Sequence, residues 1–114
     1  MTARQLATAG AAWGALLMLA PAAPLRALTG GREPAGGSTL LRVLGARHAL
    51  QAAATLAAPS LSPWTLRLGA VADALHATSA VVFARIDPRE RRAALSDAAI
   101  AAAWGAMSLQ AARR

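Results

Sequence analysis

The sequence contains no Cys, Lys, Asn or Tyr, and only 15% of its 114 residues are charged. The absence of Cys excludes a disulfide scaffold, a thiolate metal site and a Cys nucleophile. A soluble domain usually carries about 25% charged residues, so this chain has too few charges to cover a surface that faces water. Its mean hydropathy of +0.40 agrees with that shortage. These figures favour a small integral membrane protein with a single domain.

All twelve basic residues are Arg, and the net charge is +7. Ala accounts for 34 residues. Ala and Arg have GC-rich codons and Lys has AT-rich ones, so a GC-rich genome explains much of the use of Arg in place of Lys. A nucleic-acid binder would gather its basic residues on one face, often with stacking aromatic residues. Here the Arg residues stand between apolar runs, as charges that flank membrane spans do. A soluble Arg-rich nucleic-acid-binding protein is therefore the minor alternative, and no nucleic-acid partner is expected.

Four apolar segments predict an all-α fold, an antiparallel up-down four-helix transmembrane bundle. Proline and glycine separate the segments, since Pro21 ends the first, Pro59 ends the second and Pro63 opens the third. Residues 26–37 carry four Gly and one Pro and are expected to form a flexible linker. Short connections between the later segments force neighbouring helices to run antiparallel. The expected helices cover residues 5–20, 39–58, 63–85 and 88–110.

Polar residues at two of the expected helix starts are typical capping signals. Ser62 before Pro63 is expected to cap the third helix. The sharpest signal is the run from Asp87 to Glu90, with Asp87 as the N-cap and Pro88 in the first turn. Glu90 is placed to complete a capping box with Asp87, so the fourth helix is expected to begin at Pro88.

The distribution of Arg predicts an orientation in the membrane. If all four helices span, seven Arg residues lie on the side of the first and third loops, namely Arg26, Arg32, Arg42, Arg85, Arg89, Arg91 and Arg92. The other side carries both termini and four Arg residues. The positive-inside rule then places the Arg-rich loops in the cytoplasm and the protein, as a multi-pass chain, in a bacterial inner membrane. The first segment loosely fits a signal peptide, but Pro21 is unfavourable for cleavage, so this segment is expected to be retained.

Polar residues interrupt the expected spans at five positions, Arg47, Gln51, Asp73, His76 and Asp97. Counted along each helix from an Arg at the membrane edge, they lie roughly 7 to 18 Å deep on three different helices. A charged side chain at the centre of a membrane costs roughly 2.5–3.5 kcal/mol, so these groups should face inward and pair. We expect Arg47 to pair with Asp97 and Gln51 to pair with His76. Asp73 would then pair with His76 on its own helix, or with Arg47.

A polar cluster inside a membrane has two interpretations. Buried polar groups can hold helices together, which would make the protein a structural or accessory subunit. Intramembrane Asp and His can also exchange protons, which would make it a minimal proton-linked transporter or a small-ligand-binding membrane protein. The structural role is the leading expectation, and no enzymatic activity is expected.

Metal binding and nucleophilic catalysis are poorly supported. His48 and His76 lack the close paired spacing of zinc ligands, so neither a metal nor a cofactor is expected. Ser60 and Ser62 belong to a turn at the membrane face opposite the Asp and His residues, so no Ser-His-Asp triad forms. His48 is turned about 100° from Arg47 on a helix and is expected to face lipid headgroups or the first helix.

Gly10 and Gly14 form a GxxxG pattern in the first apolar segment. In a bilayer such a groove allows close approach of two helices, either within the bundle or between subunits. The expected partners are therefore the lipid bilayer and either a second copy of the chain or a larger membrane complex. Trp104, in the middle of the last segment, is expected to serve in packing rather than in ligand binding.

Three stretches, Leu44–Gln51, Asp73–His76 and Asp87–Arg92, look like a recurrent pattern. Over roughly residues 38–112, the chain resembles small four-helix integral membrane proteins of unknown function from high-GC actinobacteria. The resemblance implies a membrane location, a four-helix plan and importance of the Gly-x-Arg and Asp positions. It implies no known reaction.

Overall fold

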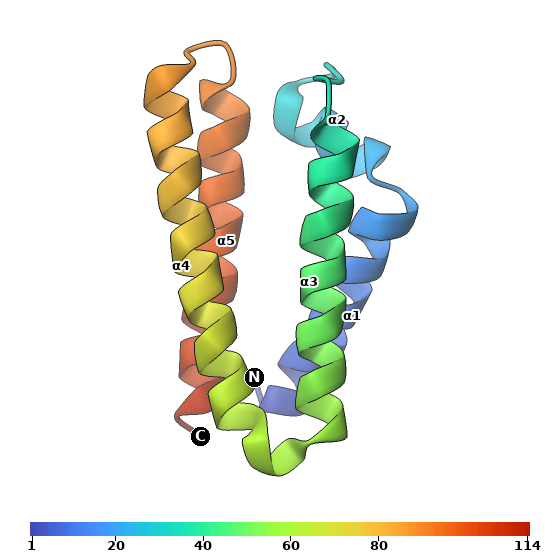
Figure 1. Cartoon of the computed structure of the whole chain (residues 1–114), viewed down its shortest axis with the longest axis vertical. Coiled ribbons are helices and arrows are strands. Elements are labelled where there is room, and N and C mark those ends of the chain that lie inside the picture. Colours follow the sequence, from blue (N-terminus) through green and yellow to red (C-terminus); the bar gives the residue numbers. More distant parts are fainter.

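The computed structural model describes all 114 residues and contains five α-helices and no strand. The predicted all-α class is confirmed, whereas the number of helices differs from the prediction (Figure 1). The elements in chain order are α1 (Ala3–Leu19), α2 (Ala22–Thr29), α3 (Gly37–Ala57), the short 3-10 helix η1 (Pro59–Leu61), α4 (Ser62–Ile86) and α5 (Arg91–Ala112).

The long helices form two antiparallel pairs that lie side by side (Figure 1). We call α1 with α3 the N-terminal hairpin, and α4 with α5 the C-terminal hairpin. Both chain termini and η1 lie at one end of the bundle, which we call the terminal end. The opposite end carries α2 and the turn between α4 and α5, and we call it the Arg-rich end. At the terminal end, Leu6 of the N-terminal hairpin packs against Leu66, Ala111 and Ala112 of the C-terminal hairpin.

The helix α2 occupies part of the segment predicted to be a flexible linker. α1 ends at Leu19, close to the predicted end, and α2 then turns away from it by 90°. Leu25 of α2 is buried against Leu17 and Leu41, which gives this short helix an apolar anchor. Gly30, with a φ of +72°, ends the helix in the left-handed conformation that glycine favours. The prediction for residues 26–37 was therefore wrong at residues 26–29, because a glycine-rich tail does not prevent helix formation before it.

The predicted capping box at Asp87 and Glu90 is wrong. Asp87 Oδ1 accepts a hydrogen bond from the backbone N–H of Arg89 at 3.0 Å, and α5 begins only at Arg91. Glu90 instead pairs with Arg32 in the loop between α2 and α3, with 2.7 Å between Arg32 Nη2 and Glu90 Oε1. Ser62 likewise makes no cap, because it is already the first residue of α4. A long-range ion pair has thus replaced the local cap.

Glycine at two positions sets the close approach of α1 and α3. A Cβ atom on Gly14 would lie 2.6 Å from the carbonyl oxygen of Gly45, and a Cβ on Gly45 would lie 2.7 Å from the carbonyl oxygen of Gly14. A Cβ on Gly10 would meet only Trp104, at 4.0 Å. The GxxxG pattern therefore serves packing within the chain, and only its second glycine is required for it.

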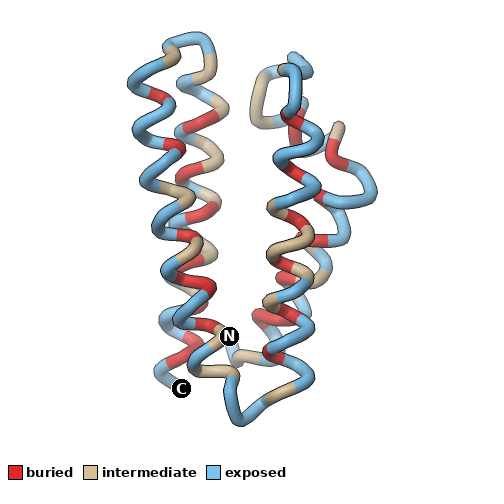
Figure 2. Tube along the Cα trace, in the orientation of Figure 1, coloured by how far each residue is buried: buried red, intermediate tan, exposed pale blue.

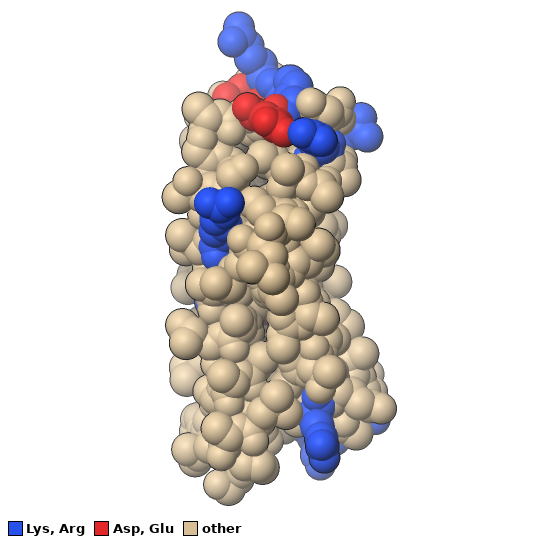
Figure 3. Space-filling model, turned by 90° about the vertical axis from the view of Figure 1, so that its right-hand side faces the viewer, with Lys and Arg blue, Asp and Glu red and all other residues tan.

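The bundle buries small side chains and exposes large apolar ones. Ten of the fifteen buried apolar residues are Ala, whereas nineteen large apolar side chains are exposed. Figure 2 shows the buried positions recurring along each long helix with exposed positions between them. Figure 3 shows charged side chains gathered toward the two ends of one face, with a wide and mostly uncharged band between them. Small residues at helix contacts and large apolar residues outside are typical of helices packed in lipid.

One helical stretch, residues 59–86, is long and apolar enough to cross a membrane, and an 18-residue window within it has a mean hydropathy of 1.3. The pair α1 and α2 meets the same test only when the two helices are taken together across their 90° bend. The prediction of four spans is therefore supported for one stretch, or for two with the bent pair. The other helices fall short for identifiable reasons, since α1 has only 17 residues and α3 carries Arg42, Arg47, His48 and Gln51.

Candidate functional site

The first group of predicted site residues joins the two hairpins near the middle of the bundle. Arg47 on α3 forms an ion pair with Asp73 on α4, in which Nη2 donates to Oδ1. Arg47 Nη1 also donates a hydrogen bond to Gln51 Oε1, one turn along α3, at 3.2 Å. The side chain of Asp73 is only 3% exposed, while that of Arg47 is 28% exposed. This arrangement neutralises the deeply buried carboxylate.

The second group lies within the C-terminal hairpin. His76 on α4 and Asp97 on α5 are 2.7 Å apart, measured from Nε2 to Oδ2. The predicted pairs Arg47 with Asp97 and Gln51 with His76 are therefore wrong, and the alternative pair of Arg47 with Asp73 is the one observed. The antiparallel packing of α4 on α5 brings His76 opposite Asp97. The long Arg side chain then reaches the deeper carboxylate.

Two glycines make room for these polar side chains between the helices. A Cβ atom on Gly69 of α4 would overlap the side-chain amide of Gln51. A Cβ atom on Gly105 of α5 would lie 3.3 Å from the Cβ atom of Asp73. Because neither glycine has a side chain, Gln51 can lie against α4 and Asp73 can lie against α5.

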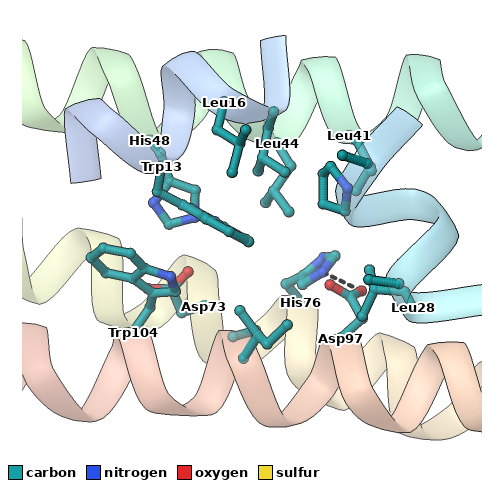
Figure 4. A pocket seen from close by; sticks show the side chains of 16 residues that line it. Trp13, Leu16, Leu28, Leu41, Leu44, His48, Asp73, His76, Asp97 and Trp104 are labelled. Atoms are coloured by element: carbon teal, nitrogen blue, oxygen red, sulfur yellow. Dashed lines mark hydrogen bonds and ion pairs between the residues drawn. The ribbon is translucent and has the colours of Figure 1, made fainter. Parts of the chain in front are cut away.

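A cavity of about 350 Å³ lies between the two hairpins (Figure 4). Side chains of all five helices line it, and most of them are apolar. Its polar and aromatic lining residues are Trp13, His48, Asp73, His76, Asp97 and Trp104. Figure 4 shows the pair of His76 and Asp97 at one end of the cavity, and Asp73, Trp104 and Trp13 at the other.

Several polar atoms of the cavity lining have no partner in the chain. The indole Nε1 of Trp13 is buried and makes no hydrogen bond. Asp73 uses only Oδ1, for Arg47, and Asp97 uses only Oδ2, for His76. A buried donor without an acceptor costs about 1–3 kcal/mol, so such a group is expected to meet a ligand or an ordered water. The two carboxylate oxygens are therefore available to a bound molecule.

A second hollow of about 560 Å³ adjoins this cavity. The two share Leu28, Leu41, Leu44, His76 and Asp97 in their linings, so the imidazole–carboxylate pair lies on the boundary between them. Arg47, Phe83 and Glu90 line the second hollow but not the first. A molecule in either hollow would therefore reach the same ion pair.

Three polar or aromatic lining residues, Trp13, His48 and Trp104, were outside the predicted site. His48 is buried, with 6% of its surface exposed, and its ring centroid lies 5.1 Å from that of Trp104. His48 therefore does not face lipid headgroups. Trp104 was expected to serve in packing rather than in ligand binding, and it both packs against His48 and lines the cavity. The buried positions Gly45, His48 and Ala52 are spaced by three and four residues along α3. That helical spacing is the signal that could have placed His48 inside.

No group of three or more His, Cys, Asp or Glu side chains is arranged to hold a metal ion. His48 forms a side-chain hydrogen bond with Arg47, and His76 forms one with Asp97. Neither imidazole is hydrogen-bonded to a Ser or Thr hydroxyl. The chain matches no protein-family model, no curated protein sequence and no solved structure. We therefore infer its function from the geometry of the site.

Proposed function

We propose that the chain is a small integral membrane protein whose cavity between the two hairpins binds a small ligand. The observation that carries this proposal is the gathering of six polar or aromatic side chains around one cavity of about 350 Å³. Ligand sites typically have volumes of about 300–1,000 Å³, mostly apolar walls and a few polar groups that fix orientation. The free carboxylate oxygens of Asp73 and Asp97 add hydrogen-bond acceptors that the chain itself does not use.

The outer surface supports the membrane location. Leu68, Leu75 and Ile86 of α4 are 68%, 65% and 73% exposed, respectively. Each Å² of apolar surface kept in water costs roughly 25 cal/mol, so lipid is the more favourable surrounding for this face. We propose a bacterial inner membrane, with the Arg-rich end toward the cytoplasm because cytoplasmic loops carry the excess of Arg.

The polar residues divide between two tasks in this proposal. The ion pair of Arg47 and Asp73 joins α3 to α4 and has the structural role expected of an accessory subunit. The pair of His76 and Asp97 joins helices of one hairpin and faces both hollows, so it is available to a ligand. Since neither imidazole has a hydroxyl partner, we propose binding without a covalent step.

The membrane location is tested by washing isolated membranes with alkaline carbonate. We expect the chain to remain in the membrane pellet and to be released by detergent, because its exposed apolar surface has no alternative partner in water. A peripheral protein in the same sample serves as the control for an effective wash. Release of the chain into the carbonate supernatant would contradict the membrane proposal.

The cavity is tested with a variant that fills it. Ala101 is 6% exposed and lines the cavity, whereas the neighbouring Ala102 is exposed, so Ala101→Leu and Ala102→Leu form a matched pair. We expect a small aromatic compound to raise the Tm of the detergent-solubilised wild type and of Ala102→Leu, since a ligand that binds the folded state stabilises it. The same compound should leave the Tm of Ala101→Leu unchanged. Equal shifts for all three proteins would place binding outside the cavity.

A further inference from the structure

We infer that the cavity takes a monovalent amphipathic cation, in which a substituted ammonium group binds beside Asp97 and a small attached apolar body extends toward the two indole rings. This inference rests on the proposed ligand binding and specifies the class of ligand. It is carried by the charges, the aromatic residues and the free oxygen atoms that surround the cavity.

The residues around the cavity leave one negative charge, that of Asp97, without a fixed positive partner. No Arg lines it, and its ionisable lining residues are His48, Asp73, His76 and Asp97. The Asp73 carboxylate is already neutralised by Arg47, which is bound to Oδ1. Asp97 has only the His76 imidazole as its partner, and that imidazole is charged only when protonated. With His76 neutral, one negative charge at Asp97 stays without compensation.

A cation can supply the missing positive charge. Asp97 Oδ1 makes no hydrogen bond and can accept one from an ammonium group, or it can lie against a quaternary ammonium as a counter-ion. The indole rings of Trp13 and Trp104, toward the other end of the cavity, offer apolar aromatic surface to the body of the ligand. An anion would instead meet two carboxylates, and a neutral molecule could gain at most a hydrogen bond from Asp97, without the attraction between opposite charges.

The apolar part of the lining determines the rest of the ligand. Leu16, Leu17, Leu41, Leu44 and Ile100 line the same cavity as the polar groups. A small inorganic cation would leave this apolar surface without contacts and would require oxygen ligands that the lining lacks. A hydrocarbon or aromatic body attached to the charge would cover it. The combination favours an amphipathic cation over a bare metal ion.

Protonation of His76 competes with binding of the cation, because both supply a positive charge beside Asp97. The titratable and charged groups that line the two hollows with His76 and Asp97 are His48 and Arg47 from α3, Asp73 from α4, and Glu90 from the turn before α5. α1 and α2 contribute only uncharged residues to the lining of the cavity. Protonation of His76 neutralises Asp97 and removes the reason for cation binding, so the affinity for the cation rises with pH across the titration of the imidazole.

Three phenyl compounds of nearly equal shape separate the charge classes, namely phenyltrimethylammonium, tert-butylbenzene and benzenesulfonate. Binding to the purified protein in detergent is measured by the rise in Tm and by calorimetry, each with the Ala101→Leu protein as the blank. We expect the cation to bind wild type at least about tenfold more tightly than the other two, a difference that corresponds to about 1.4 kcal/mol. Its affinity should rise with pH as the imidazole of His76 loses its proton.

Two variants locate the effect. Asp97→Asn should lose the preference for the cation, while His76→Gln should keep the preference and lose its dependence on pH. Asp87→Asn, in the turn before α5, is the control and should behave as wild type. The comparison of the three compounds on wild type stands even if a variant fails to fold.

Each contrary result has a defined meaning. If tert-butylbenzene or benzenesulfonate binds wild type as tightly as the cation and Ala101→Leu abolishes that binding, the inferred ligand class is wrong while the proposed ligand binding stands. If none of the three compounds binds wild type, both are wrong.

Discussion

Replacing Arg47 with Met should lower the free energy of unfolding by about 3–5 kcal/mol, the usual effect of breaking a buried ion pair by removing one partner. The reason is that Asp73, whose side chain is 3% exposed, would keep its charge without a counter-ion. The loss is measured by denaturant titration of the protein in micelles. Arg42→Met on the same helix is the matched control, because Arg42 is exposed and forms no ion pair, and it should change the stability by no more than about 0.5 kcal/mol.

The double variant Arg47→Met with Asp73→Asn distinguishes two contributions to the lost free energy of unfolding. One is the loss of the ion pair, and the other is the cost of leaving the buried Asp73 carboxylate without a counter-ion. Because Asn is nearly the same shape as Asp and uncharged, we expect the double variant to be more stable than Arg47→Met alone. Additive losses in the two single variants would show that Asp73 and Arg47 act independently. That result would remove the structural role proposed for this pair.

Replacing Gly14 with Ala should destabilise the N-terminal hairpin by about 1–3 kcal/mol, the range typical of overpacked helix contacts. The new methyl group would lie 2.6 Å from the carbonyl oxygen of Gly45 and 3.0 Å from the backbone nitrogen of Ala49, and backbone atoms cannot move aside as a flexible side chain can. α1 and α3 would have to separate. The change is followed by the same denaturant titration.

Gly10→Ala is the control for this prediction, since Gly10 belongs to the same GxxxG pattern and the same helix. Its new Cβ atom would meet only Trp104 at an ordinary 4.0 Å, so the variant should be as stable as wild type or more stable by up to about 1 kcal/mol from the better helix propensity of Ala. An equal loss of stability in both variants would mean that the whole pattern contacts a second helix, such as one from another copy of the chain.

Most helix boundaries could be predicted from the sequence because proline and glycine act locally. The third expected helix, residues 63–85, differs from α4 by one residue at each end, and Pro21 and Pro59 mark real helix ends. α2 could not be predicted in this way. Its eight residues lie between two helix-breaking stretches, and the burial of Leu25 that stabilises it depends on α1 and α3.

The residues of the site were easier to predict than their partners. Counting 1.5 Å per residue gives the height of a side chain along a helix, but it does not give the face that the side chain occupies relative to a neighbouring helix. Counting places Arg47 and Asp97 at similar heights, yet Arg47 pairs with Asp73 and Asp97 pairs with His76. The unpaired Nε1 of Trp13 is a property of the packed structure and has no counterpart in the sequence.

The two ends of the bundle are held together by different forces. At the terminal end the hairpins meet through Leu6 and Leu66, whereas at the Arg-rich end Arg32, whose side chain is 52% exposed, bridges to Glu90. Dissolved ions screen an exposed bridge and leave apolar packing intact or stronger. Rising ionic strength is therefore expected to weaken the contact between Arg32 and Glu90 at the Arg-rich end. The apolar contact at the terminal end should stay intact. In the proposed ligand-binding role, a ligand would then enter and leave the cavity at the Arg-rich end.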